Sequence, residues 1–191
     1  MTAKGYREIF GSAILIIYNF TKRKKTKYDL KTIEFSTTFS EYNSTDELEK
    51  EDRDLVQHAR EAAKAAYAPY SKFLVGAAVL LENGKIINGS NQENAAYPSG
   101  LCAERVAIFA AAAQHPGIAV KTIAITAKTE RFTTCTPVAP CGSCRQVLSE
   151  YEHLYKKPIR IILTGETGKV LIIHKIEDIL PLSFKPDDLK K

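Results

Sequence analysis

The sequence contains no tryptophan, a single methionine, no internal repeat and no low-complexity segment. None of its apolar runs reaches the roughly eighteen residues that a membrane-spanning helix needs. Repeat, fibrous and membrane-spanning architectures are therefore not expected. The 191 residues are 45% hydrophobic and 26% charged, which is typical of a globular protein with one sizeable core.

Positive charge gathers at one end of the chain. The formal net charge is +5, but residues 1–31 contain eight lysines and arginines against two acidic residues. That segment carries +6, so the remaining 160 residues carry −1. Proteins that bind nucleic acid usually have a basic folded body. The slightly acidic body of this chain therefore predicts no nucleic-acid partner.

The N-terminal segment partly imitates a secretion signal. The apolar run Ile9–Tyr18 follows two basic residues, Lys4 and Arg7. A small-residue cleavage site is missing, however, and the basic cluster Lys22–Lys25 follows, which is seldom found at a secreted mature end. We therefore expect a cytoplasmic protein without membrane association. Residues 1–44 are expected to form a basic, partly disordered extension of unassigned role, and residues 45–191 the functional domain.

The apolar periodicity of residues 45–191 predicts alternating helices and strands. A helix is expected from the capping box Ser44–Glu47 to just before Pro69. The elements expected after it are a hairpin (Phe73–Leu81 and Lys85–Asn91), a helix (Cys102–Gln114), a strand (Val120–Lys128), a helix (Cys141–Tyr151) and two strands (Ile159–Leu163 and Val170–Ile173). At most one short strand is expected earlier, near Ile33–Phe39. This order predicts an α/β fold, a three-layer α/β/α sandwich with a mixed sheet of about five strands.

Four cysteines stand at positions 102, 135, 141 and 144. A secreted protein could pair them as two disulfides. In an intracellular protein, the three-residue spacing of Cys141 and Cys144 at a predicted helix start favours metal or redox chemistry. Both sulfurs of such a pair can reach one zinc ion, and Cys102 would supply a third. Cys135 lies in a loop rich in threonine and proline, and we interpret it as a spare thiol.

Three protein ligands leave one position of a tetrahedral zinc ion open, as in catalytic sites. Glu104 is placed to take a proton from water at that position and to pass it on. The two helix N-termini, together with Arg105 and Arg145, are expected to draw charge from the sulfurs through hydrogen bonds. The alternatives are a structural zinc site or buried thiols, although no fourth ligand with suitable spacing is evident.

Three segments resemble the small, zinc-dependent cytidine deaminases. They are APYSKFLVGAA from Ala68 to Ala78, NQENAAYPSGLCAER from Asn91 to Arg105, and PCGSCRQ from Pro140 to Gln146. A zinc ligand, a glutamate two residues later and a Pro-Cys-x-x-Cys segment form the signature of zinc deaminases. The resemblance covers residues 46–190. It implies a catalytic domain with one zinc ion per subunit, held by the three cysteines at positions 102, 141 and 144.

The same resemblance implies roles for further residues. Glu104 matches the proton shuttle, and Asn91 and Glu93 match the pair that hydrogen-bonds the ribose hydroxyls. Phe73 matches the ring that packs on the pyrimidine. The resemblance also implies that Ala103, Tyr97 and Phe184 bind substrate. Tyr97 and Phe184 match aromatic residues that lie near a neighbouring subunit's site in the family's tetramers. Turn capping, core packing and the covering of a surface groove are the ordinary alternatives for these side chains.

The implied reaction is hydrolytic deamination of cytidine and 2′-deoxycytidine in pyrimidine salvage, with release of ammonia. In it a zinc-bound hydroxide attacks C4 of the base, while Glu104 protonates N3 and then the leaving amine. The resemblance also implies a homotetramer. The balance between the two nucleosides is left open by the sequence.

Three other functions compete with this interpretation. A blasticidin-type deaminase would share the cysteine motifs, but the segment Asn91–Pro98 favours a plain nucleoside. A nucleic-acid-editing deaminase would use the basic residues of the segment Lys22–Lys27 as an electrostatic contact. A non-catalytic zinc module would bind the metal without turning over any substrate.

Overall fold

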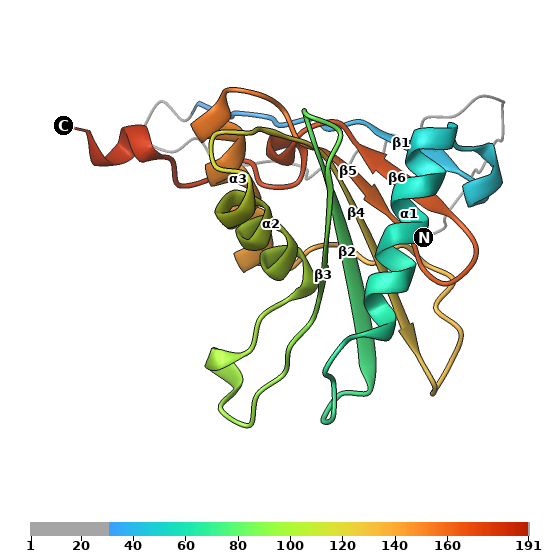
Figure 1. Cartoon of the computed structure of the whole chain (residues 1–191). Coiled ribbons are helices and arrows are strands. Elements are labelled where there is room, and N and C mark those ends of the chain that lie inside the picture. Colours follow the sequence, from blue (N-terminus) through green and yellow to red (C-terminus); the bar gives the residue numbers. More distant parts are fainter. Residues whose placement is uncertain (1–30, 191) are drawn as a thin grey trace, which may run out of the picture. The chain divides into compact units, whose positions relative to one another are not determined.

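The computed structural model describes residues 31–190. From Phe35 onward they form one compact unit, built on a six-stranded sheet of order β1-β6-β5-β4-β2-β3 (Figure 1). The strands are β1 (Phe39–Tyr42), β2 (Phe73–Leu81), β3 (Ile86–Ser90), β4 (Val120–Thr129), β5 (Arg160–Leu163) and β6 (Val170–Ile173). The helices are α1 (Lys50–Lys64), α2 (Ala103–Gln114) and α3 (Gly142–Tyr155). The sheet is mixed, because β4 and β5 run parallel whereas the other neighbouring pairs are antiparallel.

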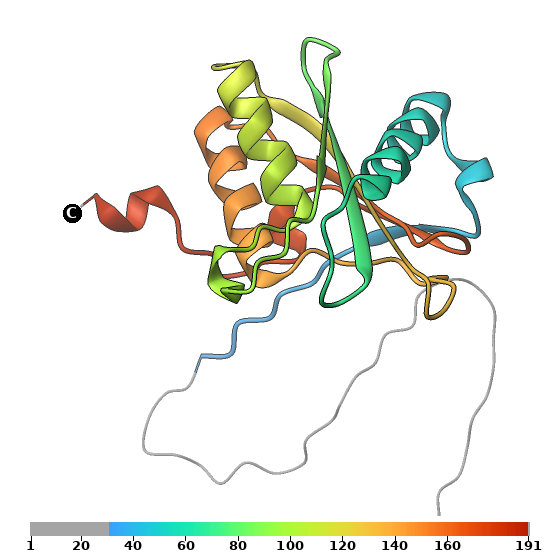
Figure 2. The same cartoon turned by 60° about the horizontal axis from the view of Figure 1, so that its bottom comes forward.

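Helices cover both faces of the sheet, which confirms the predicted three-layer α/β/α sandwich. Figure 2 shows α1 on one side of the strands and α2 and α3 together on the other. The central strand β2 buries side chains on both faces. Its residues Ala77 and Val79 pack in the cluster under α2 and α3, whereas Ala78 and Leu80 pack in the cluster under α1. Burial on both faces explains why β2 has a nearly continuous apolar sequence.

The sheet has six strands, one more than the predicted number. The additional strand, β1, pairs antiparallel with β6, so that Phe39 lies opposite Ile173 and Tyr42 opposite Val170. It is only four residues long, and its exposed side chains alternate with half-buried ones. Such a short edge strand depends on its partner strand more than on an apolar pattern of its own. It also places part of the segment 1–44 within the sheet.

The predicted capping box does not open the first long helix. Ser44 Oγ accepts a hydrogen bond from the backbone amide of Asp46, and the Glu47 carboxylate accepts one from the amide of Asn43. These contacts close a short 3-10 turn, Thr45–Glu47. The chain then becomes extended at Leu48, which is 4% exposed, and α1 begins at Lys50. The buried, extended Leu48 thus lies between the turn and the helix.

Helices α2 and α3 begin at the same end of the sheet, where β2 starts and β4 ends. Phe73 at the start of β2 lies opposite Thr129 at the end of β4. The chain leaves β4 there, crosses a loop and enters α3 with Cys141 as the N-cap residue, while Cys102 is the N-cap residue of α2. The first turns of both helices are thereby brought close together.

Within residues 31–190, none of the helices combines the length and the apolar character that crossing a bilayer requires. The signal-like run Ile9–Tyr18 and the basic cluster Lys22–Lys25 lie outside the described residues.

Candidate metal centre and substrate pocket

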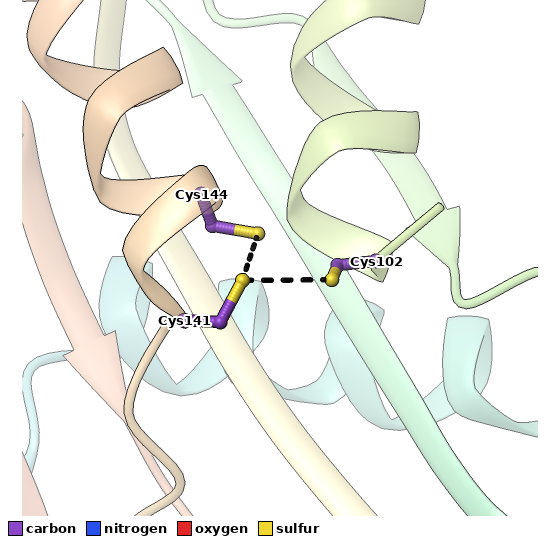
Figure 3. Close-up of side chains that lie close together, drawn as sticks. All are labelled: Cys102, Cys141 and Cys144. Carbon is purple, nitrogen blue, oxygen red and sulfur yellow. Dashed lines mark hydrogen bonds between the residues drawn. The ribbon is translucent and has the colours of Figure 1, made fainter. Parts of the chain in front are cut away.

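The three predicted cysteine ligands lie together although they come from two helices. Figure 3 shows their sulfur atoms facing one another across the gap between the first turns of α2 and α3. The Sγ atom of Cys141 lies 3.8 Å from that of Cys102 and 3.5 Å from that of Cys144. All three sulfurs lie within 4.8 Å of one another.

These distances fit a shared zinc ion better than a disulfide. A disulfide requires the two sulfurs to be about 2.05 Å apart. Two thiolates that bind one tetrahedral zinc ion at about 2.3 Å lie about 3.8 Å apart. Among the described residues, no further histidine, cysteine or acidic side chain joins the three cysteines as a potential ligand. The donor set therefore suits zinc and leaves its fourth position open.

The charges around the sulfurs favour a thiolate. Arg105 Nη2 donates a hydrogen bond to the Sγ atom of Cys102 at 3.8 Å. The neighbouring Cys144 thiol and then Arg105 lower the pKa of Cys102 to about 5. The pKa of Cys144 is raised instead, by the adjacent Cys102 and by burial. Of these two thiols, the one beside the arginine therefore ionises first, and metal binding must displace the proton of Cys144.

Glu104 lies in the first turn of α2, two residues after the Cys102 ligand. Its side chain is only 5% exposed, and it borders the same cavity as the cysteines. Burial raises the pKa of Glu104, and the negative charge of Cys102 adds to the effect. A buried carboxylate next to an open metal position can hold a proton and give it up again, which suits general acid–base chemistry.

A cavity of about 790 Å³ opens above the cysteines and Glu104. This volume is in the range of sites that bind small molecules. Apart from Phe184, every residue predicted to bind substrate lines it: Phe73, Asn91, Glu93, Tyr97 and Ala103. The structure therefore brings the predicted substrate residues and two of the predicted metal ligands, Cys102 and Cys141, to one cavity.

Asn91 joins the ends of two strands through its side-chain amide. Its Oδ1 atom accepts a hydrogen bond of 2.8 Å from the amide of Val75, and its Nδ2 atom donates one of 3.0 Å to the carbonyl of Phe73. The amide thus continues the pairing of β2 and β3 beyond Ser90. Each polar atom retains capacity for one more hydrogen bond, so Asn91 can still bind a hydroxyl at the cavity edge.

Glu93 is held by the backbone of the loop before β2. One carboxylate oxygen accepts hydrogen bonds from the amides of Tyr70 and Ser71, at 2.9 and 3.2 Å. A hydrogen bond from the Ser71 side chain lowers the pKa of Glu93 the most, and the two backbone amides lower it further. The carboxylate is thus kept ionised, and its other oxygen can accept a hydroxyl.

Two predicted residues, Arg145 and Phe184, lie elsewhere. The sequence interpretation expected Arg145 to donate to a sulfur. Its Nε atom instead donates to the carbonyl of Pro140 and its Nη1 atom to that of Ile179, at 2.9 and 2.8 Å. Phe184 is 57% exposed and stands outside the cavity, and its carbonyl accepts a hydrogen bond from Gln146 Nε2. The free thiol of Cys135 is exposed and lies apart from the cysteine cluster.

Several cavity residues were not predicted as site residues. Val138 and Ala139 form part of the wall, and Tyr70 stands at the rim, where its ring meets that of Tyr97 edge to face at 6.2 Å. Tyr70 belongs to the motif Ala68–Ala78, so the sequence contained a signal for it. Val138 and Ala139 lie in an irregular loop with no distinctive pattern, and only the fold shows where they lie.

Comparisons with known proteins agree with this geometry. A family model described as the cytidine and deoxycytidylate deaminase zinc-binding region matches residues 49–157. A cytidine deaminase of Halalkalibacterium halodurans is 39% identical over 135 residues, which are 71% of this chain and 95% of the relative. A cytidine deaminase of Sporosarcina psychrophila is 40% identical over 136 residues, which are 71% of this chain and 92% of the relative.

A solved structure supports the same assignment. The crystal structure of cytidine deaminase from Burkholderia pseudomallei has 41% sequence identity and a TM-score of 0.60, and the match covers 69% of this chain and 97% of that one. The chain therefore belongs to the cytidine and deoxycytidylate deaminase family of zinc hydrolases. The predicted family, the predicted class of enzyme and the predicted fold class are confirmed.

Proposed function

We propose that this protein hydrolyses cytidine and 2′-deoxycytidine to uridine and 2′-deoxyuridine, with release of ammonia, and serves pyrimidine salvage. The observation that carries the proposal is the group of three sulfurs from Cys102, Cys141 and Cys144, open on one side and bordered by the buried carboxylate of Glu104. A zinc ion bound there, one per subunit, would lower the pKa of water at the open position and so supply a nucleophile at neutral pH.

The cavity residues suggest how the nucleoside is oriented. Asn91 and Glu93 are both fixed by backbone hydrogen bonds at the cavity edge, and both retain polar capacity for the ribose hydroxyls. Phe73 offers an aromatic surface to the pyrimidine. In this orientation the base extends towards the cysteines, so that C4 and its amino group come close to Glu104.

Glu104 moves the two protons that the reaction requires. Its carboxylate accepts a proton from the attacking water and gives it to N3 of the ring. As the tetrahedral carbon collapses, Glu104 takes the second proton from the new C4 hydroxyl and gives it to the leaving 4-amino group, so that C4 becomes a carbonyl while the C4–N bond breaks to release ammonia. Water therefore provides the oxygen of the product, and the carboxylate returns to its initial state.

We further propose a homotetramer in the cytoplasm. The tetramer is supported by Phe184, because an aromatic ring that is 57% exposed and outside its own cavity can reach the site of a neighbouring subunit. The reducing cytoplasm suits a centre built from free thiols. The oligomeric state can be measured by native mass spectrometry, where a monomer would contradict the role of Phe184.

The proposed activity can be tested with the full chain. Turnover of cytidine, deoxycytidine and blasticidin S is followed by ultraviolet absorbance and ammonia release, and zinc is quantified on the same sample. We expect one zinc ion per chain and turnover of both nucleosides. Turnover of blasticidin S alone would replace the proposed substrate, and zinc without any turnover would indicate a non-catalytic module.

A matched pair of cysteine variants tests the centre itself. Cys144→Ser replaces a buried sulfur of the cluster, whereas Cys135→Ser replaces an exposed sulfur outside it. We expect the first variant to lose zinc and activity and the second to keep both. Equal loss in the two variants would contradict the assignment of the metal ligands.

A further inference from the structure

The wall of the cavity contains a segment that has no regular structure. Strand β4 ends at Thr129 and α3 begins at Gly142, and the chain between them contributes Val138, Ala139 and Cys141 to the cavity. No helix or sheet ladder holds these residues in place. One long backbone hydrogen bond, from the Val138 amide to the carbonyl of Thr164 at 3.4 Å, reaches the wall directly, so its position depends mainly on the contacts that anchor the segment at its two ends.

Thr134 is the anchored residue of this segment. It is 5% exposed, and its hydroxyl donates a hydrogen bond of 2.5 Å to the carbonyl of Ala127 in β4. Its backbone amide donates to Glu166 Oε2 at 3.1 Å, and its carbonyl accepts from the backbone amide of Glu166 at 2.7 Å. Thr134 and Glu166 are thus joined through backbone and side chain together.

The turn that carries Glu166 is itself firmly held. Arg60 Nη2 of α1 donates to the carbonyl of Glu166 at 3.2 Å, and the Thr126 hydroxyl of β4 donates to the carbonyl of Gly165 at 3.1 Å. A β-carbon at Gly165 would lie 2.3 Å from the carbonyl oxygen of Thr134, so this close approach requires glycine. The turn between β5 and β6 therefore provides a rigid support for the wall segment.

Glu166 has no contact with the cavity. It is not among the lining residues, and its carboxylate contacts Thr134, so its effect on the pocket is indirect. At the other end of the wall segment, Arg145 holds the carbonyl of Pro140. Val138 and Ala139 lie between the contact of Thr134 with Glu166 and the contact of Pro140 with Arg145. A change at either contact will therefore shift the position of these two wall residues.

From these contacts we propose that Glu166 is a positioning residue for the substrate pocket, acting through Thr134 on the wall residues Val138 and Ala139. This inference rests on the proposed function insofar as it names the pocket as the place where a nucleoside binds. Loss of the Glu166 carboxylate removes the acceptor of the Thr134 amide and loosens the wall. The zinc ligands, which are helix N-cap and first-turn residues, remain in place.

The test compares Glu166→Ala with Glu166→Gln and a control variant, Glu47→Ala, in the full chain. Gln retains an oxygen that can accept the Thr134 amide. Glu47 also accepts a backbone amide, that of Asn43, but does so in the turn before α1, outside the cavity. Hydrogen–deuterium exchange of residues 134–139, zinc content, kcat and KM are measured for all of them.

For Glu166→Ala we expect amide exchange of residues 134–139 to increase about tenfold, the equivalent of losing one buried hydrogen bond. The KM for cytidine should rise by a similar factor of about ten, with kcat changed less than about threefold and zinc content unchanged. Glu166→Gln should restore both values, and Glu47→Ala should match the wild type. A general loss of stability would not produce this split between KM and kcat.

The inference is overturned if exchange and KM in Glu166→Ala equal those of the wild type, or if Glu47→Ala shows the same changes. Failure of the proposed function is a separate outcome, because it would appear as absence of cytidine turnover in the wild type. In that case exchange of residues 134–139 still decides whether Glu166 holds the wall. If Glu166→Ala does not fold, Thr134→Val, which removes the hydroxyl bond to Ala127, must show the same rise in exchange and KM.

Discussion

Gly89 of β3 lies directly against Ala107 of α2. A β-carbon at Gly89 would stand 2.4 Å from the backbone nitrogen of Ala107 and 2.6 Å from the carbonyl oxygen of Ala103. Both contacts are with helix backbone, which cannot rotate away as a flexible side chain can. The absence of a side chain at Gly89 therefore determines how closely α2, with Cys102 and Glu104, approaches the sheet.

Gly89→Ala is expected to disturb the metal centre as well as the fold. The added methyl group should cost about 1–3 kcal/mol of unfolding free energy, as overpacking does. It should also weaken zinc binding about tenfold, in the range seen when the support of a metal ligand is lost, because α2 carries one ligand and α3 carries two. Urea unfolding and competition with a chromogenic zinc chelator measure the two effects.

Gly76→Ala is the matched control. A β-carbon at Gly76 would lie 2.0 Å from the carbonyl oxygen of Ala59, so the substitution displaces α1 on the opposite face of the sheet. We expect a comparable or larger loss of stability and a zinc affinity close to that of the wild type. Equal weakening of zinc binding in both variants would mean that the effect follows global stability and not the position of α2.

The clustering of the three cysteines could be predicted from the sequence because their motifs are local. Cys102 and Cys141 each begin a helix, and the helix start fixes where the next few side chains lie. Glu104 and Cys144 follow within a single turn. A helix start can be read from a few consecutive residues, so the cysteine cluster and the acidic residue beside it could be predicted without the fold.

The remaining features depend on partners that are distant in the sequence. Arg145 donates to Ile179, which is 34 residues away, and Thr134 is held by Glu166, which is 32 residues away. Strand β1 pairs with β6, more than a hundred residues later. No local pattern specifies such pairs, because the free energy that selects them comes from tertiary contacts. For this reason the sequence did not indicate the carbonyl partners of Arg145, and β1 was not counted in the sheet.

Arg145 is expected to hold the approach to Cys141. Its guanidinium bridges the carbonyls of Pro140 and Ile179, and therefore ties the wall segment to the chain after β6. Arg145→Ala should weaken zinc binding about tenfold or more, as loss of a supporting contact does. Arg145→Lys should restore little, because a single ammonium group does not reproduce the planar fork. Zinc competition and limited proteolysis after Ile179 provide the measurements.

Arg53 offers a control with the same chemistry. Its Nη1 atom donates to two carbonyls, those of Asp46 and Leu48, but these lie in the segment just before α1. Arg53→Ala should lower stability without changing zinc affinity or cleavage near Ile179. If Arg145→Ala behaves like Arg53→Ala, the arginine after Cys144 has only a general structural role.

Glu104→Gln is expected to separate metal binding from catalysis. The amide has nearly the same shape as the carboxylate and leaves the three cysteines unchanged, so zinc content should equal that of the wild type. Turnover of cytidine should fall by about 10²–10⁴-fold, because the amide cannot accept and return a proton. Zinc analysis and ammonia release on the same preparation provide the measurement. A variant that keeps wild-type turnover would remove Glu104 from the proton path.

Glu152 gives the protein a pH dependence of stability that is independent of the metal centre. Its Oε1 atom accepts hydrogen bonds from the amides of Ile159 and Ile176, at 2.6 and 2.9 Å, and thus ties the end of α3 to the start of β5 and to the turn after β6. Burial raises the pKa of Glu152 above its ordinary value. The folded state therefore binds the proton more tightly than the unfolded state does.

The sign of the effect follows from this raised pKa. As pH increases from about 4.3, where an unfolded glutamate loses its proton, the wild type loses stability until the folded pKa is passed. Glu152→Gln keeps an oxygen for both amides and does not titrate. The unfolding free energy of this variant minus that of the wild type should therefore increase through the same pH window. Above that window the difference should stay constant. Urea unfolding at a series of pH values measures the difference.

Glu150→Gln, on the exposed side of the same helix, controls for the loss of one negative charge. The difference between the two variants should appear only across the window in which Glu152 titrates. If both variants follow the same pH curve, the wild-type dependence arises from net charge. If Glu152→Gln instead loses stability relative to the wild type as pH rises, the charged carboxylate is the preferred state at this position, and its two amide bonds outweigh the cost of burial.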